Sequence, residues 1–379
     1  MAKGGKRRGF SRRLASLRSG LGAEWALGAG VATAVFFAFA GERLFDRLGE
    51  PLWFALIFAW LFAILAVSTL AVVRHADHVA EALGEPLGTL ILTLSITTVE
   101  VLSISAVMLH GANNPTLVRD TLFAIVMIIL GGMVGASLLF GGLRHREQHY
   151  NLQGANAYLG VIIPLAMLTL SLPNFTVSTA GPTLSLPQQV FLATVAIGLY
   201  IVFLAIQTGR HRGYFSTEEA DDPRRTVPRR SAARHAALLI AYIASIVFLA
   251  EHLARPIDHL IETLRLPTAL GGIVIAVLVA MPEAVGATRA ALANRLQRAI
   301  NIFLGSVLST MGLSVPVMLA VSYVTDHPVL LGLEGANNFL LMTTLAVSVV
   351  TFASGRTNVL QGAVHVVLFA AFLMLVFDA

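Results

Sequence analysis

Long apolar stretches alternate with short polar segments along the whole chain. Eleven of these stretches are about 20 residues long, which is the length that an α-helix needs to cross the roughly 30 Å hydrocarbon core of a bilayer. The pattern predicts an all-α polytopic membrane protein with about 11 transmembrane helices. The expected spans are residues 23–40, 52–73, 87–109, 121–142, 155–172, 188–207, 235–254, 267–289, 299–324, 337–353 and 357–377.

The composition agrees with a membrane protein and excludes several kinds of chemistry. Of the 379 residues, 56% are hydrophobic and 12% are charged, whereas a soluble domain has roughly 25% charged residues. The absence of cysteine excludes disulfides, thiolate metal sites and cysteine nucleophiles. No GxxxxGKS/T, HExxH or GxSxG motif occurs, so we expect neither direct use of ATP nor a common hydrolase site. No cofactor is expected.

The positive charges predict the orientation of the chain. If the spans alternate across the membrane, 21 of the 26 Lys and Arg residues fall on the side of the N-terminus. Because cytoplasmic loops are enriched in Lys and Arg, we expect a cytoplasmic N-terminus and a periplasmic C-terminus. The net charge of +5 is then a signal of topology and of contact with the lipid bilayer, and it is no evidence for nucleic acid binding.

A long polar segment divides the apolar pattern into two parts. It contains the sequence TEEADDPRRTVPRR, which cannot form a core. Six spans precede it and five follow it, which indicates an extra N-terminal helix and two five-helix halves. Since five is odd, the second half is expected to be inverted relative to the first. The predicted organisation is a basic cytoplasmic tail (1–22), an extra transmembrane helix (23–50), a first half (51–207), a cytoplasmic linker (208–234) and a second half (235–379).

Two glutamates interrupt the apolar pattern at equivalent places. Glu100 is the only charged residue between Glu85 and Arg119, and Glu283 is the only one between Arg265 and Arg289. Each lies in the second span of its half, 12 residues after a glycine. A charge in this position costs roughly 2.5 to 3.5 kcal/mol on insertion scales, so intramembrane acids usually mark ion paths. In two inverted halves the acids can meet near the midplane, as in many secondary transporters. Pro282, beside Glu283, either frees a backbone carbonyl as a ligand or only kinks the helix.

Hydroxyl groups lie on the same helices or near them. Thr93 and Thr97 share a helix face with Glu100, and Ser306, Ser309 and Thr310 lie in the span 299–324. Oxygen atoms of this kind are the ligands that hard cations prefer. We therefore name Glu100, Glu283, Thr97, Thr93, Ser306 and Ser309 as candidate cation ligands. The alternative is that these hydroxyls and the nearby small residues only serve close helix packing.

A polar stripe in the last span and a group of histidines near the third span have two readings each. Asn358, Gln361 and His365 share a face, where His365 could relay protons or all three could form hydrogen bonds between helices.

His75 and His78 could gather cations or sense pH together with two nearby glutamates (Glu81 and Glu85). A solvated loop is the favoured reading for this second group.

Three stretches resemble the Ca²⁺:cation antiporter superfamily, and most closely its bacterial ChaA-type branch. They are GEPLGTLILTLSITTVEV (84–101), MPEAVGATRAALANRLQRAINIFLGSVLST (281–310) and SGRTNVLQGAVHVVLFAAFLM (354–374). The resemblance implies that Glu100 and Glu283 are the paired acids that bind cation and proton in turn. It also implies a multi-pass protein of the bacterial inner membrane. The Asn-x-x-Glu motif of the family's Ca²⁺/H⁺ exchangers is altered here to Thr97 and Ala280, so the ion preference stays open.

These observations lead to an expected function. We expect a secondary cation:proton antiporter that exports Ca²⁺, with Na⁺ or K⁺ as further substrates. Burial favours the uncharged form of a carboxyl group, so both glutamates should be protonated until a cation displaces the protons. A Na⁺(K⁺):H⁺ antiporter with little Ca²⁺ activity is the nearest alternative. A cation channel, an intramembrane hydrolase and a structural subunit are the alternatives of other classes.

Overall fold

The computed structural model describes residues 24–84, 87–110, 114–215 and 229–377. Ten of its helices are long and apolar enough to cross a membrane, and an eleventh apolar helix, Gly335–Thr351, is shorter. These eleven helices correspond to the eleven predicted spans, so the prediction of an all-helical membrane protein is confirmed. The predicted tail (1–22) lies outside the described residues, as do residues 216–228 of the predicted linker (208–234).

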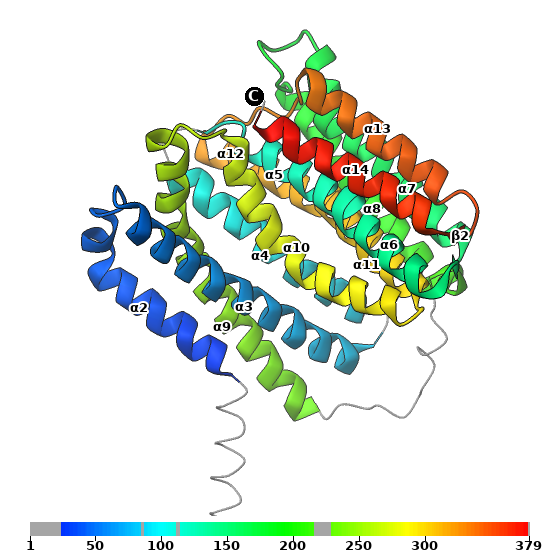
Figure 1. Ribbon diagram of the computed structural model, residues 1–379, viewed down its shortest axis with the longest axis horizontal. Helices are drawn as coiled ribbons and strands as arrows, with labels where there is room; N and C mark the ends of the chain where they lie inside the picture. Colours follow the sequence, from blue (N-terminus) through cyan, green and yellow to red (C-terminus); the bar gives the residue numbers. More distant parts are fainter. Residues whose placement is uncertain (1–23, 85–86, 111–113, 216–228, 378–379) are drawn as a thin grey trace, which may run out of the picture.

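The first part of the chain contains six of the spans (Figure 1). Its elements are α2 (Trp25–Phe45), α3 (Pro51–Leu83), α4 (Leu87–His110), α5 (Leu117–Val126), η1 (Met127–Met133), α6 (Val134–His145), β1 (Gln148–His149), α7 (Leu152–Ala166), η2 (Met167–Ser171), η3 (Leu172–Phe175), α8 (Leu186–Ala205), η4 (Ile206–Arg210) and η5 (Arg212–Tyr214). The elements α5, η1 and α6 follow one another without a break and form one span.

The second part contains the other five spans. Its elements are α9 (Arg229–Asp258), η6 (His259–Thr263), α10 (Ala269–Leu292), α11 (Leu296–Ser309), η7 (Thr310–Ser314), α12 (Val315–Thr325), α13 (Gly335–Thr351), β2 (Arg356–Thr357) and α14 (Val359–Val376). The elements α11, η7 and α12 form one continuous span, like α5, η1 and α6 in the first part.

Contacts between the helix ends show that the chain alternates across the bundle. We call the side on which α2 begins the first side. There β1 pairs with β2 in antiparallel fashion, with Gln148 opposite Thr357, and the side chain of Gln148 donates a hydrogen bond to the carbonyl of Ala291 near the end of α10. On the opposite side, the backbone N–H of Leu330 donates to the carbonyl of Pro115. The helices α4 and α10 therefore run in opposite directions.

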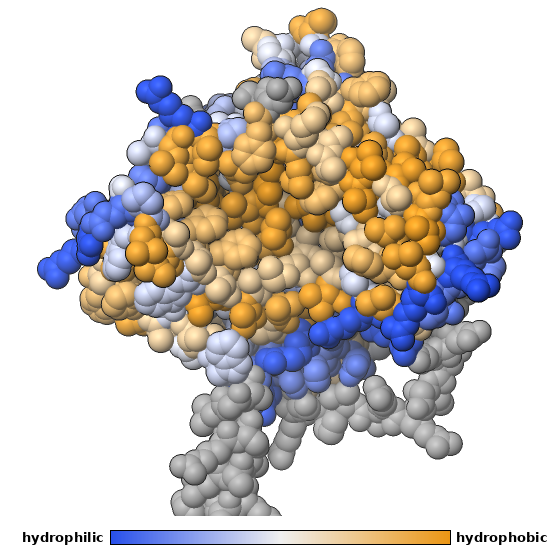
Figure 2. Space-filling view, viewed as in Figure 1, coloured by the Kyte–Doolittle hydropathy of each residue, from blue (hydrophilic) through white to orange (hydrophobic). Residues whose placement is uncertain are grey.

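The outer surface of the bundle is apolar. Figure 2 shows a broad hydrophobic face over the helices, bordered at its lower edge by hydrophilic residues. Large apolar side chains point outward along the spans, among them Phe39, Ile201 and Phe339, which are 88%, 59% and 72% exposed. An exposed apolar area of this extent is stable only in contact with lipid. The chain is a multi-pass membrane protein.

Two of the spans contain a π-helical turn near their middle. The turns are η1 in the span α5–α6 and η7 in the span α11–α12. For η7 the sequence supplies a reason, because Pro316 has no N–H group to pair with the carbonyl four residues earlier, at Gly312. Such turns occur frequently at functional sites, and η7 lies beside Glu100.

Candidate functional site

The two predicted glutamates lie in the interior of the bundle, on antiparallel helices. Glu100 on α4 is 1% exposed and Glu283 on α10 is 7% exposed. Their carboxyl groups are close enough to interact electrostatically. The opposite directions of α4 and α10 allow two acids at similar depths to face one another, which is the arrangement expected from inverted halves.

Glu100 has a hydrogen-bond donor from the second half of the chain. The hydroxyl of Thr310 donates to Glu100 Oε2 over 3.0 Å. Ser314, one turn further along η7, faces the same carboxyl group without a hydrogen bond to it. The π-helical turn thus carries two hydroxyl groups toward Glu100.

Several oxygen atoms around the glutamates are buried and have no hydrogen-bond partner among the described residues. They are Thr97 Oγ1, Glu100 Oε1, Glu283 Oε2 and Ser314 Oγ. Leaving a buried polar atom unpaired costs about 1 to 3 kcal/mol, and more for a charged group. Either a proton or a cation would remove this cost, since carboxylate and hydroxyl oxygens are suitable ligands for hard cations. Residues of this type fit a transported cation.

The site does not have the composition of a resident metal centre. Within the described ranges, no group of three or more His, Asp or Glu side chains has an arrangement that could hold a metal ion. The two carboxylates would therefore need hydroxyl or carbonyl oxygens to complete the coordination of a cation.

A cavity of about 250 Å³ leads from the first side of the bundle to Glu283. Its wall includes the predicted hydroxyl residues Thr93, Ser306 and Ser309. Gln207 and Arg298, near the first-side ends of their helices, also line it. Glu100 is not part of this wall. Glu283 is thus the glutamate that a cation entering from the first side would reach first.

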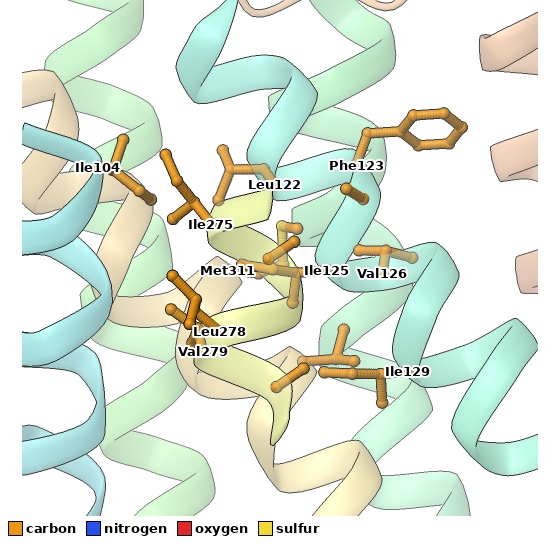
Figure 3. Close-up of a cluster of buried hydrophobic side chains, with 14 of the residues drawn as sticks. Ile104, Leu122, Phe123, Ile125, Val126, Ile129, Ile275, Leu278, Val279 and Met311 are labelled. Atoms are coloured by element: carbon orange, nitrogen blue, oxygen red, sulfur yellow. The ribbon is translucent and has the colours of Figure 1, made fainter. Parts of the chain in front are cut away.

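An apolar layer closes the site from the opposite side. Figure 3 shows Ile104, Ile275, Leu278 and Met311 packed together with residues of α5 and η1. Ile104 follows Glu100 by one turn, whereas Ile275 and Leu278 precede Glu283 on the antiparallel helix, so all three lie on the same side of the pair. Each of these four side chains is at most 6% exposed. Among the described residues, the pair is therefore reached from the first side, through Glu283, and it is closed by this layer on the opposite side.

The predicted hydroxyl ligands have different surroundings. Thr97 Oγ1 is buried without a partner. Thr93 lies in the cavity wall, close to Tyr200, and Ser309 donates its hydroxyl to the carbonyl of Ser306 over 2.9 Å. Ser314 was not a candidate from the sequence. Its spacing of four residues from Thr310 was the available signal, since such residues share a helix face.

His365 has two hydrogen-bond partners, and neither is a glutamate. Its Nδ1 lies 2.6 Å from the carbonyl of Leu130, and its Nε2 lies 2.9 Å from the hydroxyl of Thr351. Gln361 also contacts Thr351, because its Nε2 donates to the Thr351 carbonyl over 3.4 Å, so these two residues form hydrogen bonds between helices as one of the readings expected. Asn358 instead makes a capping box with Gln361 at the start of α14. A relay role for His365 stays a prediction, without a contact to the pair.

The helix that carries Glu283 is continuous. Pro282 lies inside α10, which extends without interruption from Ala269 to Leu292. A broken helix is therefore not the means by which this site is built. A proline leaves the carbonyl four residues earlier, at Leu278, without its usual N–H donor even in a continuous helix, so both interpretations of Pro282 stay predictions.

Comparison with known proteins identifies the family. The sequence profile described as "Sodium/calcium exchanger protein" matches residues 53–209 and 234–377. The chain is 43% identical over 316 residues to the putative ionic transporter y4hA of Sinorhizobium fredii, covering 82% of this chain and 86% of that protein. It is 39% identical over 325 residues to the sodium-potassium/proton antiporter ChaA of Escherichia coli, covering 84% and 88%.

Solved structures share the fold at lower sequence identity. Native YfkE superposes with a TM-score of 0.72 at 18% identity, covering 93% of this chain and 99% of that one. The H⁺/Ca²⁺ exchanger CAX gives a TM-score of 0.60 at 14% identity, covering 93% and 88%. The chain therefore belongs to the sodium/calcium exchanger family of the Ca²⁺:cation antiporter superfamily, and it is a secondary cation exchanger rather than an enzyme.

Proposed function

We propose that this protein exports Ca²⁺, and also Na⁺ or K⁺, in exchange for protons that bind to Glu100 and Glu283. One observation carries the proposal. Two buried carboxyl groups interact with each other, and each has an oxygen atom without a partner among the described residues. Such a pair is stable when protonated or when a cation lies between its members, and it is costly when empty and charged.

Competition for the pair provides the coupling. Two carboxylates supply two negative charges, which balance one Ca²⁺ or two protons. A cation binds only after protons leave, and protons return only after the cation leaves. Since either occupant avoids a bare charge in the membrane, the loaded forms are the ones that change access from one side to the other.

The orientation is part of the proposal. The side richest in Lys and Arg is the first side, which we assign to the cytoplasm by the positive-inside rule. The cavity that reaches Glu283 would then open to the cytoplasm, as required for uptake of a cation for export. The N-terminus would be cytoplasmic and the C-terminus periplasmic, in a bacterial inner membrane. Groups of helices drawn from both halves would move relative to each other during transport.

A Na⁺(K⁺):H⁺ antiporter with little Ca²⁺ activity is the second candidate. Thr97 and Ala280 stand where the family's Ca²⁺/H⁺ exchangers have amides, so two potential oxygen ligands are missing. Ca²⁺ takes six to eight oxygen ligands and depends on such groups more strongly than a monovalent cation. The name of the E. coli relative, a sodium-potassium/proton antiporter, agrees with this candidate.

Inside-out vesicles with a preformed pH gradient test both candidates. Ca²⁺, Na⁺ and K⁺ are added separately, and dissipation of the gradient is recorded for the wild type, Glu100→Gln, Glu283→Gln and the exposed control Glu147→Gln. Dissipation by all three ions supports the proposal, and dissipation by Na⁺ and K⁺ alone supports the second candidate. Cation flux without proton movement would indicate a channel. Unchanged exchange in both site variants would refute the role of the pair.

A further inference from the structure

Five polar side chains meet at the first-side ends of α2, α3 and α9. Glu24 stands directly before α2, Arg74 and His75 lie on α3, and His235 and Tyr242 lie on α9. Glu24 Oε2 accepts hydrogen bonds from Arg74 at 3.0 Å and from Tyr242 at 3.1 Å. It also lies 3.1 Å from His75 Nε2. The cluster joins the extra N-terminal helix to the first helix of each half.

The two histidines of this cluster contact each other directly. His75 Nδ1 lies 2.7 Å from His235 Nδ1, and the His75 side chain is completely buried. A hydrogen bond between two imidazole nitrogens needs one donor and one acceptor, so one proton must lie between the rings. Two N–H groups cannot face each other at this distance.

This geometry accommodates some protonation states and not others. When both rings are neutral, His235 donates through Nδ1 to His75, and His75 donates through Nε2 to Glu24. When one further proton is bound, His75 becomes an imidazolium that donates to both Glu24 and His235. When both rings are charged, each Nδ1 carries a proton and the contact must break.

Glu24 remains charged while the histidines titrate. Burial alone would raise the pKa of Glu24, but the hydrogen bond from His75 and the charges of His75 and Arg74 lower it below its usual value. A lowered pKa means that Glu24 is ionised throughout the range in which histidine titrates. Burial and the charge of Arg74 act against a positive charge on His75, and the Glu24 carboxylate partly offsets them. Glu24 does not stabilise a second charge on His235 to the same extent.

The surrounding charged groups act against the second proton. On α9, Arg234 interacts repulsively with His235. On α3, the ring of His78 stacks on that of His235 with centroids 4.3 Å apart, so protonation of one ring disfavours protonation of the other. On the same helix, Asp77 interacts with Glu81, with Arg298 and with His78.

We propose that the contact between His75 and His235 is a second proton-binding site, distinct from the glutamate pair, which holds α3 against α9 and releases them when both rings are protonated. The sequence alone favoured a solvated loop at His75, which is wrong, because α3 extends to Leu83 and buries this side chain. The proposed site lies where α2, α3 and α9 meet, and it is not part of the transport path.

A regulatory consequence rests on the proposed function. If the first side is cytoplasmic, acidification of the cytoplasm separates α3 from α9 and slows exchange. Proton entry would then stop when the cytoplasm is already acidic. The transport cycle itself depends on pH because protons are a substrate, so the test needs a readout that does not involve transport.

Spin-label distance measurements provide this readout. The chain has no native cysteine, so Leu83→Cys and Ala233→Cys place one label at the exposed first-side end of each helix. We expect the distance distribution to shift to longer values between pH 8 and pH 5.5 with a wild-type cluster. His235→Gln, which cannot gain a charge, should remove the shift. His149→Gln, an exposed histidine on the same side, is the control and should keep it. His235→Asn repeats the test if His235→Gln does not fold.

Transport measurements with the same variants test the consequence. We expect the wild-type exchange rate to fall by about threefold when the first-side pH is lowered from 8 to 5.5, because burial and the neighbouring charges oppose the second proton and move its binding toward the acidic end of this range. His235→Gln should lose most of this decrease, and His149→Gln should retain it. Equal distance shifts in the wild type and in His235→Gln would overturn the inference, whatever the transport result. Failure of exchange in every variant, with the distance shift intact, would instead contradict the proposed function.

Discussion

The surroundings of Glu100 and Glu283 differ although the two residues have equivalent places in the chain. Glu100 accepts a hydrogen bond from Thr310 and has no contact with the cavity, whereas Glu283 lines the cavity and has no partner for its Oε2 among the described residues. One oxygen atom of each acid is buried without a partner among the described residues, so the two acids differ in their access to the cavity and in their hydroxyl neighbours. This difference suggests an order of events, in which Glu283 exchanges its proton first and Glu100 completes the binding of the cation.

The difference arises from residue types at matching positions. Thr310 follows Glu283 by 27 residues, and Met127 follows Glu100 by the same number. Both begin a π-helical turn, η7 and η1 respectively. The hydroxyl of Thr310 donates a hydrogen bond to Glu100, the glutamate of the other half. The thioether of Met127 is only a weak acceptor, and it receives a hydrogen bond from Thr344. Two similar backbones thus give Glu100 a hydroxyl donor from the π-helical turn of the other half, and they place no hydroxyl at the equivalent position for Glu283.

Neutralising either glutamate should have the largest effect. A cation and a carboxylate, as two opposite unit charges about 4 Å apart, attract each other by about 4 kcal/mol at an effective dielectric constant of 20. We therefore expect Glu100→Gln and Glu283→Gln each to lower cation-dependent proton flux by about 100-fold or more. The vesicle assay measures this. If either variant kept most of its activity, the two acids would not act as a pair.

Removing the donor to Glu100 should have the next largest effect. A hydrogen bond to a charged group contributes about 1.5 to 3 kcal/mol, so Thr310→Val should raise the half-saturating cation concentration by about 10- to 100-fold. Ser306→Ala, at the cavity wall beside Glu283, should raise it by less than about fivefold. The measurement is the cation dependence of exchange in vesicles. An equal effect of the two substitutions would contradict the unequal surroundings of the acids.

The accessibility of the two sides can be compared with one kind of substitution. Ser306→Cys places a thiol in the cavity wall, and Ser103→Cys places one three residues beyond Glu100 in the closed region, where Ser103 is 7% exposed. A membrane-impermeant thiol reagent added to the first side should modify the first variant at least about ten times faster. Similar rates would mean that the apolar layer does not close the path.

Restoring the symmetry of the π-helical turns should have the smallest effect. Met127→Thr introduces a hydroxyl at the position equivalent to Thr310. If the two halves are related as proposed, this hydroxyl can reach Glu283, and we expect about a two- to fivefold change in the half-saturating cation concentration. Met127→Leu is the control, because it keeps the volume without a donor. No difference between the two variants would show that η1 does not face Glu283.

The sequence was sufficient to predict the helices and the two acids. Apolar length and charge distribution are one-dimensional properties, and an acid such as Glu100 is conspicuous in an apolar span. The direction in which a side chain points was much harder to predict. His365 and Gln361 share a helix face and both contact Thr351, yet His365 is buried between helices and Gln361 also caps the start of its own helix.

The errors at the helix ends have a related cause. The segment that includes His75 and His78 is too polar to count as part of a span, so its sequence predicts a solvated loop. It is nevertheless helical, because the polar residues of a helix that extends beyond the bilayer can be satisfied by neighbouring helices and water. The contact between His75 and His235 joins residues 160 positions apart, and no local pattern predicts such a contact.

The glycines of α6 bear on how the protein can move. At Gly135 an added Cβ atom would lie 2.8 Å from the backbone nitrogen of Val366, and at Gly142 it would lie 2.9 Å from that of Val359. Backbones this close leave no space for side chains to slide past one another. Helices α6 and α14 must therefore move as a single block during the transport cycle, so any rearrangement has to take place at contacts between other helices.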